Sequence, residues 1–415
     1  MNICKKGILY TALFTAVLSV SVQAREPAVS SAAAQAARHY DYELDVFHPV
    51  QARNGMVASE HRLASEVGLQ ILQQGGNAVD AAVAMGFALA VVLPNAGNLG
   101  GGGFMLLHDA QTGSNHALDF RETAPTAAHR DLYLDQDGNL IEGESIYSHR
   151  AVGVPGTVAG LEHALKNWGS MSLKEVIRPA IGLASKGFTV SHTLANMLDV
   201  QQEQLGQWQG TRDIFFKGER PLQAGDRLVQ KDLARSLKLI SRQGSKAFYE
   251  GKIAVAIVDE MQRHGGLISL QDLAAYRVVE RAPVSGDYRG YQVVSMPAPS
   301  SGGIHLLQIL NILESFPLKE QGANSAESVR LIAEAAKLAY ADRSEYLGDP
   351  DFVKVPQQGL ISKQYAAQLA TSIRPGSVRD ARSIGPGNPA DFESDQTTHY
   401  SVVDSRGNMV GSPIH

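Results

Sequence analysis

Apolar residues at helical spacing mark the first strongly patterned part of the chain. The apolar positions from Leu63 to Ile71 recur every four residues, which predicts a helix with one buried face that Ser59 is expected to cap. Asn77 is expected to cap a second helix over residues 78–92. Because this second helix is apolar on nearly every side, we expect it to be fully buried.

Strand and helix patterns alternate with turns further along the chain. Residues 172–275 are expected to be mostly helical. The other predicted elements are a hairpin of strands over 104–108 and 116–120, a strand over 291–296, and helices over 174–186, 252–264 and 326–340.

The pattern breaks down over residues 374–395, where proline and glycine interrupt a polar stretch. This composition predicts a long exposed loop. A strand over 397–403 follows, and a turn leads into a partner strand that begins at 409. We do not expect residues 411–414 to continue that strand, because Pro413 has no N–H group for a sheet ladder.

The N-terminus has the pattern of a secretory signal. Lys5 and Lys6 precede an apolar run over 8–20, and Val22-Gln23-Ala24 supplies the small residues of a cleavage site. The alternative is a membrane anchor, but the run is shorter than the roughly 20 residues that a bilayer requires. We therefore predict a signal peptide over residues 1–24 and a periplasmic or secreted protein.

Composition excludes several function classes. The 415 residues carry 37 Lys and Arg against 42 Asp and Glu, and this net charge of -5 argues against nucleic acid as a partner. Cys4 is the single cysteine, so a disulfide framework and cysteine-based metal or thiol chemistry are excluded. The 13 histidines include no His-Glu-x-x-His pair, and we predict neither a metal nor another cofactor.

Several motifs favour a structural interpretation over a functional one. The glycine run 100–103 lacks the Gly-Lys-Ser/Thr end of a phosphate loop and precedes a strand, which favours a tight turn with close packing. The acidic stretch 133–144 has Tyr133 in place of the first calcium ligand, so it is interpreted as a turn. His305 and His399 lie in apolar surroundings typical of core histidines.

Arg121 and Thr397 are the two candidates with distinct chemistry. Arg121 ends a predicted strand, where its guanidinium could form two hydrogen bonds to a substrate carboxylate; the alternative is an ion pair with Glu122 or Asp119. Cleavage after Gln396 would give Thr397 a free α-amino group, which could act as the base for its own hydroxyl. The alternative is that Thr397 simply begins a strand.

A series of motifs over residues 50–410 resembles the bacterial γ-glutamyltransferases, also called glutathione hydrolases. Their order and spacing make this resemblance highly specific. The matching segments are 54–58, 75–82, 97–104, Asp119-Phe120-Arg121-Glu122, 154–157, Pro299-Ser300-Ser301-Gly302-Gly303, 340–343, 347–350 and Gln396-Thr397-Thr398-His399-Tyr400-Ser401.

The resemblance implies an α+β fold, the four-layer αββα sandwich of N-terminal-nucleophile hydrolases. It implies that the threonine matching Thr397 attacks the carbonyl of Gln396, which splits an inactive precursor into a large subunit ending at 396 and a small subunit. The new N-terminal threonine then attacks glutathione or another γ-glutamyl compound, while the arginine matching Arg121 holds the α-carboxylate. Water, an amino acid or a dipeptide accepts the acyl group, and no cofactor or metal is used.

The sequence departs from this family after the predicted strand at Thr397. The family continues through a small subunit with oxyanion-hole glycines, whereas residues 397–415 match only its first strands. Since losing one oxyanion donor typically costs 100- to 1000-fold in turnover, we expect this chain alone neither to mature nor to hydrolyse glutathione. Two alternatives stay open: a related acylase of the same superfamily, or a non-catalytic large-subunit remnant that needs a separate partner.

Overall fold

The computed structural model describes residues 51–393, 398–403 and 409–414, and from 394 onward it describes only the strand backbone. The chain divides into two units, Met1–Gly55 and Met56–His415, and the second contains every helix and strand described here. The predicted signal peptide 1–24 and the following stretch to residue 50 lie outside the described residues. Among the described helices, none combines the length and apolar character needed to cross a bilayer.

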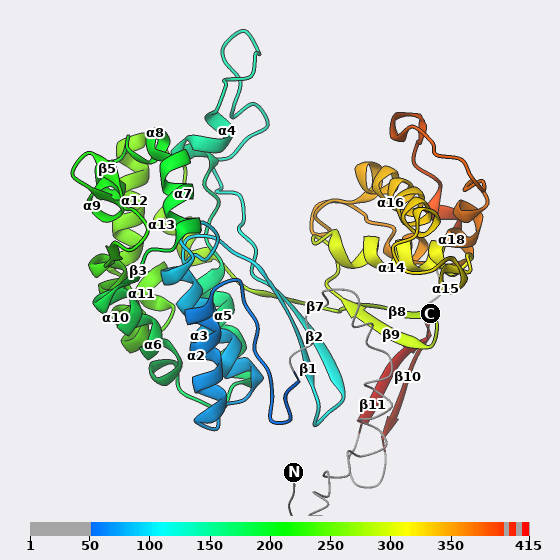
Figure 1. Cartoon of the computed structure of the whole chain (residues 1–415), viewed down its shortest axis with the longest axis horizontal. Helices are drawn as coiled ribbons and strands as arrows, with labels where there is room; N and C mark the ends of the chain where they lie inside the picture. The colour runs from blue at the N-terminus through cyan, green and yellow to red at the C-terminus, as the bar shows by residue number, and fades with distance from the viewer. Residues whose placement is uncertain (1–50, 394–397, 404–408, 415) are drawn as a thin grey trace, which may run out of the picture. The chain divides into compact units, whose positions relative to one another are not determined.

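The first two helices form the predicted pair. Helix α2 (Arg62–Gln73) packs against α3 (Ala78–Val92), and both are blue in Figure 1. The predicted cap of α2 is wrong. His61 caps it, because its Nδ1 accepts the N–H of Leu63 at 3.2 Å, while the Ser59 hydroxyl bonds to the His61 carbonyl and to Ser65.

Helix α3 is the predicted buried helix, and it begins with a capping box. The Asn77 side chain accepts the N–H groups of Val79 and Asp80, and the Asp80 carboxylate accepts the N–H of Asn77. Asp80 is fully buried and also accepts bonds from Ser170 and Met171, so it joins α3 to a segment 90 residues away.

A helical layer surrounds α3 and forms the largest hydrophobic core. Helices α5 (Thr157–Trp168) and α6 (Leu173–Lys186) pack on α3, and α10 (Lys231–Gln243) packs on α6. Phe87, Ile177 and other fully buried side chains fill this core. The predicted helix over 252–264 is α12 (Lys252–His264), and the mostly helical interpretation of residues 172–275 is confirmed.

The predicted hairpin is part of a three-stranded antiparallel sheet. Strand β1 (Phe104–Asp109) pairs with β2 (Ser114–Asp119), and β2 pairs with β7 (Val279–Arg281), so the order is β1-β2-β7. Phe104 lies opposite Asp119, and Asp119 lies opposite Val279. The sheet therefore brings Arg121, which follows β2, close to a strand from much later in the chain.

The later part of the chain contains a second group of helices beside a hairpin. Strands β8 (Val284–Tyr288) and β9 (Tyr291–Ser295) contact α14 (Gly302–Leu313), which packs on α16 (Ala326–Tyr346) and α18 (Lys363–Ala370). The predicted helix ends at residue 340, whereas α16 runs six residues further.

The remaining elements are short. They are α4 (Glu144–Tyr147), η1 (His149–Ala151), β3 (Phe188–Thr189), α7 (His192–Val200), α8 (Gln202–Leu205), α9 (Gln209–Phe215), β4 (Phe216–Lys217), β5 (Arg220–Pro221), β6 (Arg227–Leu228), α11 (Lys246–Tyr249), α13 (Leu270–Ala275), α15 (Leu318–Gln321), α17 (Gln357–Leu360), η2 (Ala381–Ser383) and η3 (Pro389–Phe392).

The predicted terminal hairpin is present, with one correction. Strand β10 (Thr398–Val403) pairs antiparallel with β11 (Met409–Ile414), and Pro413 lies opposite His399. The expectation that Pro413 prevents a strand over 411–414 was wrong. In a two-stranded sheet each strand has an unpaired edge, and a residue without an N–H group is tolerated there.

The buried carboxylate of Asp80 generates the first prediction. Burial alone would raise its pKa, but hydrogen bonds from Ser170, Met171 and Asn77 outweigh burial and hold the pKa below its ordinary value. Asp80→Asn should therefore lower the free energy of unfolding by about 2–4 kcal/mol at pH 7, measured by urea denaturation. The difference should shrink as the pH falls below about 4, because the wild-type carboxylate then loses its advantage over the unfolded state.

The exposed turn carboxylate Asp137 is the matched control for that measurement. Asp137→Asn should change the free energy of unfolding by no more than about 0.5 kcal/mol. Equal effects of the two substitutions would show that the tie from α3 to Ser170 contributes nothing to stability.

Candidate active site

Arg121 lies directly after β2 with its backbone fixed and its side chain exposed. Its N–H donates to Asp119 Oδ1 at 3.0 Å, and its carbonyl accepts the Tyr276 hydroxyl at 2.9 Å. The guanidinium carbon lies 6.0 Å from the centre of the Phe104 ring. Within the described residues, this guanidinium forms no hydrogen bond or ion pair with another side chain.

The alternative prediction for Arg121, an ion pair with Glu122 or Asp119, is not observed among the described residues. Asp119 pairs with Arg281, whose Nε lies 2.8 Å from Asp119 Oδ2. The two terminal nitrogens of Arg281 contact both oxygens of Asp351, at 3.1 and 2.7 Å. The hydrogen bonds that Arg281 donates to Asp351 and Asp119 raise the pKa of Arg281. Because Arg281 neutralises Asp119, the positive charge of Arg121 remains available for another partner.

The glycine run 100–103 packs against the backbone that carries Arg121. A Cβ on Gly102 would lie 2.5 Å from the Phe120 carbonyl oxygen and 2.8 Å from the Arg121 Cα, closer than atoms can approach. Gly103 also exchanges two backbone hydrogen bonds with Phe120. The predicted tight turn with close packing is confirmed, and its effect is to fix the end of β2.

A second segment supports this turn from the other side. The Gly101 carbonyl accepts the N–H groups of Gly156 and Thr157 at 2.7 and 3.0 Å. The Asn98 side-chain oxygen accepts the N–H of Gly101 and the hydroxyl of Thr157. Gly156 allows no side chain, since a Cβ there would lie 2.0 Å from the Phe120 carbonyl oxygen.

The chain beyond Arg121 is held by Asp272, at the start of α13. Its Oδ1 accepts the N–H and the hydroxyl of Thr126, at 2.9 and 2.6 Å, and its Oδ2 accepts two bonds from Ser269. Burial would raise the pKa of Asp272, but hydrogen bonds from Ser269 and Thr126 lower it to about 2. Asp272 is therefore charged at neutral pH and fixes the segment that follows Arg121.

The other residues named in the sequence analysis either have structural roles or lie outside the described residues. His305 is buried in α14, and its Nε2 lies 3.1 Å from the Ala339 carbonyl oxygen, so it is the predicted core histidine. Ser300 lies in the predicted turn before α14. Gln396, Thr397 and the side chain of His399 lie outside the described residues, although the strand predicted to follow the cleavage site is β10.

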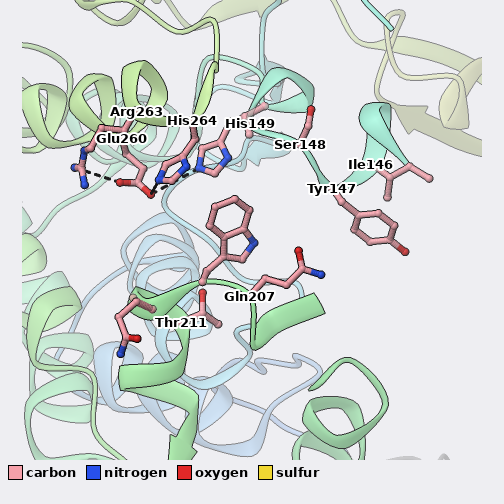
Figure 2. Close-up of a pocket in the computed structure, with 13 residues that line it drawn as sticks. Ile146, Tyr147, Ser148, His149, Gln207, Thr211, Glu260, Arg263 and His264 are labelled. Carbon is pink, nitrogen blue, oxygen red and sulfur yellow. Dashed lines mark ion pairs between the residues drawn. The ribbon is translucent and has the colours of Figure 1, made fainter. Parts of the chain in front are cut away.

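A pocket that the sequence did not reveal lies between η1, α9 and α12. Figure 2 shows its residues, and its volume is about 910 Å³. The rings of His149 and His264 stack 4.7 Å apart, and their Nε2 atoms lie 3.7 and 3.4 Å from the same oxygen of Glu260. Arg121 does not line this pocket. Its residues come from three distant segments, and no local pattern links them.

The described residues hold no group of three or more histidine, cysteine, aspartate or glutamate side chains that could bind a metal. In the pocket of Figure 2, Arg263 also pairs with Glu260. The Glu260 carboxylate therefore already has cationic and imidazole partners.

Comparison with known proteins first defines the class of protein. A γ-glutamyltranspeptidase chain from Helicobacter pylori superimposes with a TM-score of 0.81 at 46% identity, over 84% of this chain and 100% of that chain. This similarity confirms the predicted fold class, α+β with the N-terminal-nucleophile hydrolase fold.

The family follows from the sequence match. The family model "Gamma-glutamyltranspeptidase" matches residues 64–412, and the chain belongs to this family. A glutathione hydrolase proenzyme from Escherichia coli is 55% identical over 372 residues, which is 89% of this chain. An acylase proenzyme, ACY 1, from a Pseudomonas species is 41% identical over 88% of the chain.

The chain spans less than two thirds of these relatives' length. It covers 64% of the Escherichia coli proenzyme and 65% of the acylase proenzyme.

Arg281 generates a prediction about the scaffold of the site. Arg281→Met should leave Asp119, whose side chain is 8% exposed, without its charged partner, and should lower the free energy of unfolding by about 3 kcal/mol. Urea denaturation measures the change. Arg212→Met is the matched control, because its partner Glu219 is 93% exposed, and it should cost less than about 1 kcal/mol. Similar losses for both variants would contradict the role given to Arg281.

Proposed function

We propose that this chain carries the large-subunit region, residues 25–396, and the first strands of the small subunit, 397–415, of a γ-glutamyl hydrolase and transferase. The substrate class is glutathione and other γ-glutamyl amides, with water, amino acids or dipeptides as acceptors. The predicted signal over residues 1–24 supports a periplasmic or secreted location. Family membership and the proenzyme names of the similar proteins support this function.

The reaction begins with Thr397 in the precursor. Its hydroxyl oxygen attacks the carbonyl carbon of Gln396, the peptide C–N bond breaks, and the threonine nitrogen takes up a proton to become a free amine. Water then hydrolyses the resulting ester, which leaves a carboxylate on Gln396 and restores the hydroxyl. The free amine has an ordinary pKa near 8, so its neutral form can accept the hydroxyl proton in the next reaction.

In turnover the same oxygen attacks the γ-carbonyl of the substrate. The C–N bond of the γ-glutamyl amide breaks, and the leaving amine receives the proton that Thr397 gave up. Water or an acceptor amine then attacks the acyl-threonine ester and regenerates the hydroxyl. The chemistry requires only protein groups and substrate.

The exposed guanidinium of Arg121 is the single observation in the structure that best supports a γ-glutamyl substrate. A γ-glutamyl group carries an α-carboxylate at the end remote from the reacting carbonyl, and an arginine can bind such a carboxylate with two parallel hydrogen bonds. Since Asp119 is already paired with Arg281, nearby protein carboxylates do not consume this charge.

The acylase interpretation rests on a specific observation, the 41% identity to the ACY 1 proenzyme. A bulky acyl substrate without an α-carboxylate would gain nothing from Arg121. A third interpretation, a non-catalytic remnant that needs a separate partner, predicts neither cleavage nor turnover. The two experiments below separate these three functions.

In the full-length precursor, that is, this chain completed with the rest of the small subunit, Thr397→Ala should abolish both self-cleavage and turnover, because the attacking oxygen is gone. Intact mass spectrometry detects cleavage as two products, one ending at residue 396 and one beginning at residue 397. Release of nitroaniline from γ-glutamyl-p-nitroanilide measures turnover. Thr398→Ala removes the adjacent hydroxyl and is the control; it should still be cleaved. Cleavage of Thr397→Ala at the wild-type position would disprove the assigned nucleophile.

Arg121→Ala should raise KM for γ-glutamyl-p-nitroanilide by about 30-fold or more, since two charge-assisted hydrogen bonds are lost. It should leave hydrolysis of 4-aminobutyryl-p-nitroanilide, which lacks the α-carboxylate, near the rate of the unsubstituted enzyme. Arg130→Ala, another exposed arginine nine residues further on, is the control and should leave both substrates unaffected. Equal losses on the two substrates would contradict carboxylate binding by Arg121.

A further inference from the structure

The polar segment before the proposed cleavage site is the predicted exposed loop, and side-chain hydrogen bonds also hold it to the helices around it. Over residues 374–393 it contains only the short turns η2 and η3. Three carboxylates, Glu334, Asp342 and Glu393, join it to the rest of the chain. Pro389 is buried, and the Phe392 ring lies 5.4 Å from the ring of Tyr365.

The first tie is made by Glu334, on α16. Its side chain is 1% exposed and accepts the N–H and the Nε of Arg379 at 3.1 and 2.7 Å, and the Lys337 ammonium at 2.7 Å. Burial would raise the pKa of Glu334, but these bonds lower it to about 2. The tie is therefore charged and intact at neutral pH.

The second tie is made by Asp342, eight residues after Glu334 on α16. It is buried, and its Oδ1 accepts the N–H of Gly387 at 2.7 Å while its Oδ2 accepts the Tyr365 hydroxyl at 2.8 Å. The Tyr346 hydroxyl donates to the Gly387 carbonyl at 2.6 Å. A Cβ on Gly387 would lie 2.1 Å from the Tyr365 oxygen, so only glycine fits here.

The third tie is nearest to the proposed cleavage site. The Glu393 carboxylate accepts the N–H of Gly359 at 2.7 Å and that of Gln358 at 3.4 Å. Gly359 in turn lies against Pro389, since a Cβ there would be 2.1 Å from the Pro389 carbonyl oxygen. Only residues 394–396 separate this tie from Thr397.

We propose that Glu393, with Asp342 and Tyr346 behind it, is a positioning residue for the cleavage between Gln396 and Thr397. This inference rests on the proposed function. Glu393 does not contact the reacting atoms. It fixes the chain at residue 393, three residues before the residue whose carbonyl reacts, which raises the probability that this carbonyl meets the threonine hydroxyl.

Loop-closure statistics set the size of the effect. Without the Glu393 tie, the next fixed backbone point is Gly387, and the number of residues between the last tie and Thr397 rises from three (394–396) to nine (388–396). Because closure probability falls with roughly the 3/2 power of length, complete release would slow cleavage by about 5-fold. The packing of Pro389 and Phe392 opposes release, so the expected slowing for Glu393→Ala is about 2- to 5-fold.

The experiment follows self-cleavage of the full-length precursor over time by intact mass spectrometry. Glu393→Ala should be cleaved about 2- to 5-fold more slowly than wild type, and adding Tyr346→Phe should slow cleavage further. Glu393→Gln keeps an oxygen that can accept the Gly359 N–H and should restore most of the rate. Asp391→Ala is the matched control, because this carboxylate bonds only to Asn388 within the same segment and should leave the rate unchanged.

A positioning role has a second signature that a general loss of stability would not give. Once cleaved, the Glu393→Ala protein should hydrolyse γ-glutamyl-p-nitroanilide with unchanged kcat and KM, and its melting temperature should match that of Glu393→Gln. If Glu393→Ala lowers the melting temperature, it is compared with the double variant that also carries Tyr346→Phe, which should be cleaved more slowly still.

The outcomes separate this inference from the proposed function. A wild-type precursor that is never cleaved at 396–397 would overturn both. Wild-type cleavage together with wild-type rates for Glu393→Ala and for the Glu393→Ala, Tyr346→Phe double variant would overturn the positioning role and leave the proposed function standing. A slowing shared by Asp391→Ala would also overturn the role, since that residue makes no tie outside its own segment.

Discussion

The ion pair between Asp119 and Arg281 connects the parts of the molecule on which the candidate site depends. Asp119 ends β2, Arg281 ends β7, and the guanidinium continues to Asp351 beyond α16. The same Asp119 carboxylate accepts the N–H of Arg121. One partly buried arginine thus fixes the strand end that presents Arg121 and consumes the negative charge that would otherwise compete for it.

Buried carboxylates repeat this principle elsewhere in the chain. Asp80, Asp272, Glu334 and Asp342 each accept backbone N–H groups from a segment distant in sequence. A segment rich in glycine and proline cannot satisfy its own backbone groups in a helix or sheet, so charged acceptors replace the missing ladder. The polar segment 374–393 is ordered by such bonds rather than by regular secondary structure.

This explains which features were predictable from the sequence. The helix cap at Asn77 and the bounds of α12 depend on neighbouring residues, and both were predicted correctly. The prediction that Ser59 caps α2 was wrong because His61, a less common capping residue, caps the helix instead. Local patterns identified Arg121 as chemically unusual, but they could not show that Arg281, from a strand 160 residues later, would take Asp119. The pocket of Figure 2 escaped prediction for the same reason.

The polar segment 374–393 is an exposed loop, as its composition predicts, and it is nevertheless ordered. Proline, glycine and charged residues are typical of exposed loops because they disfavour helices and sheets. They do not prevent order when another element supplies acceptors at the right places, as α16 does through Glu334 and Asp342.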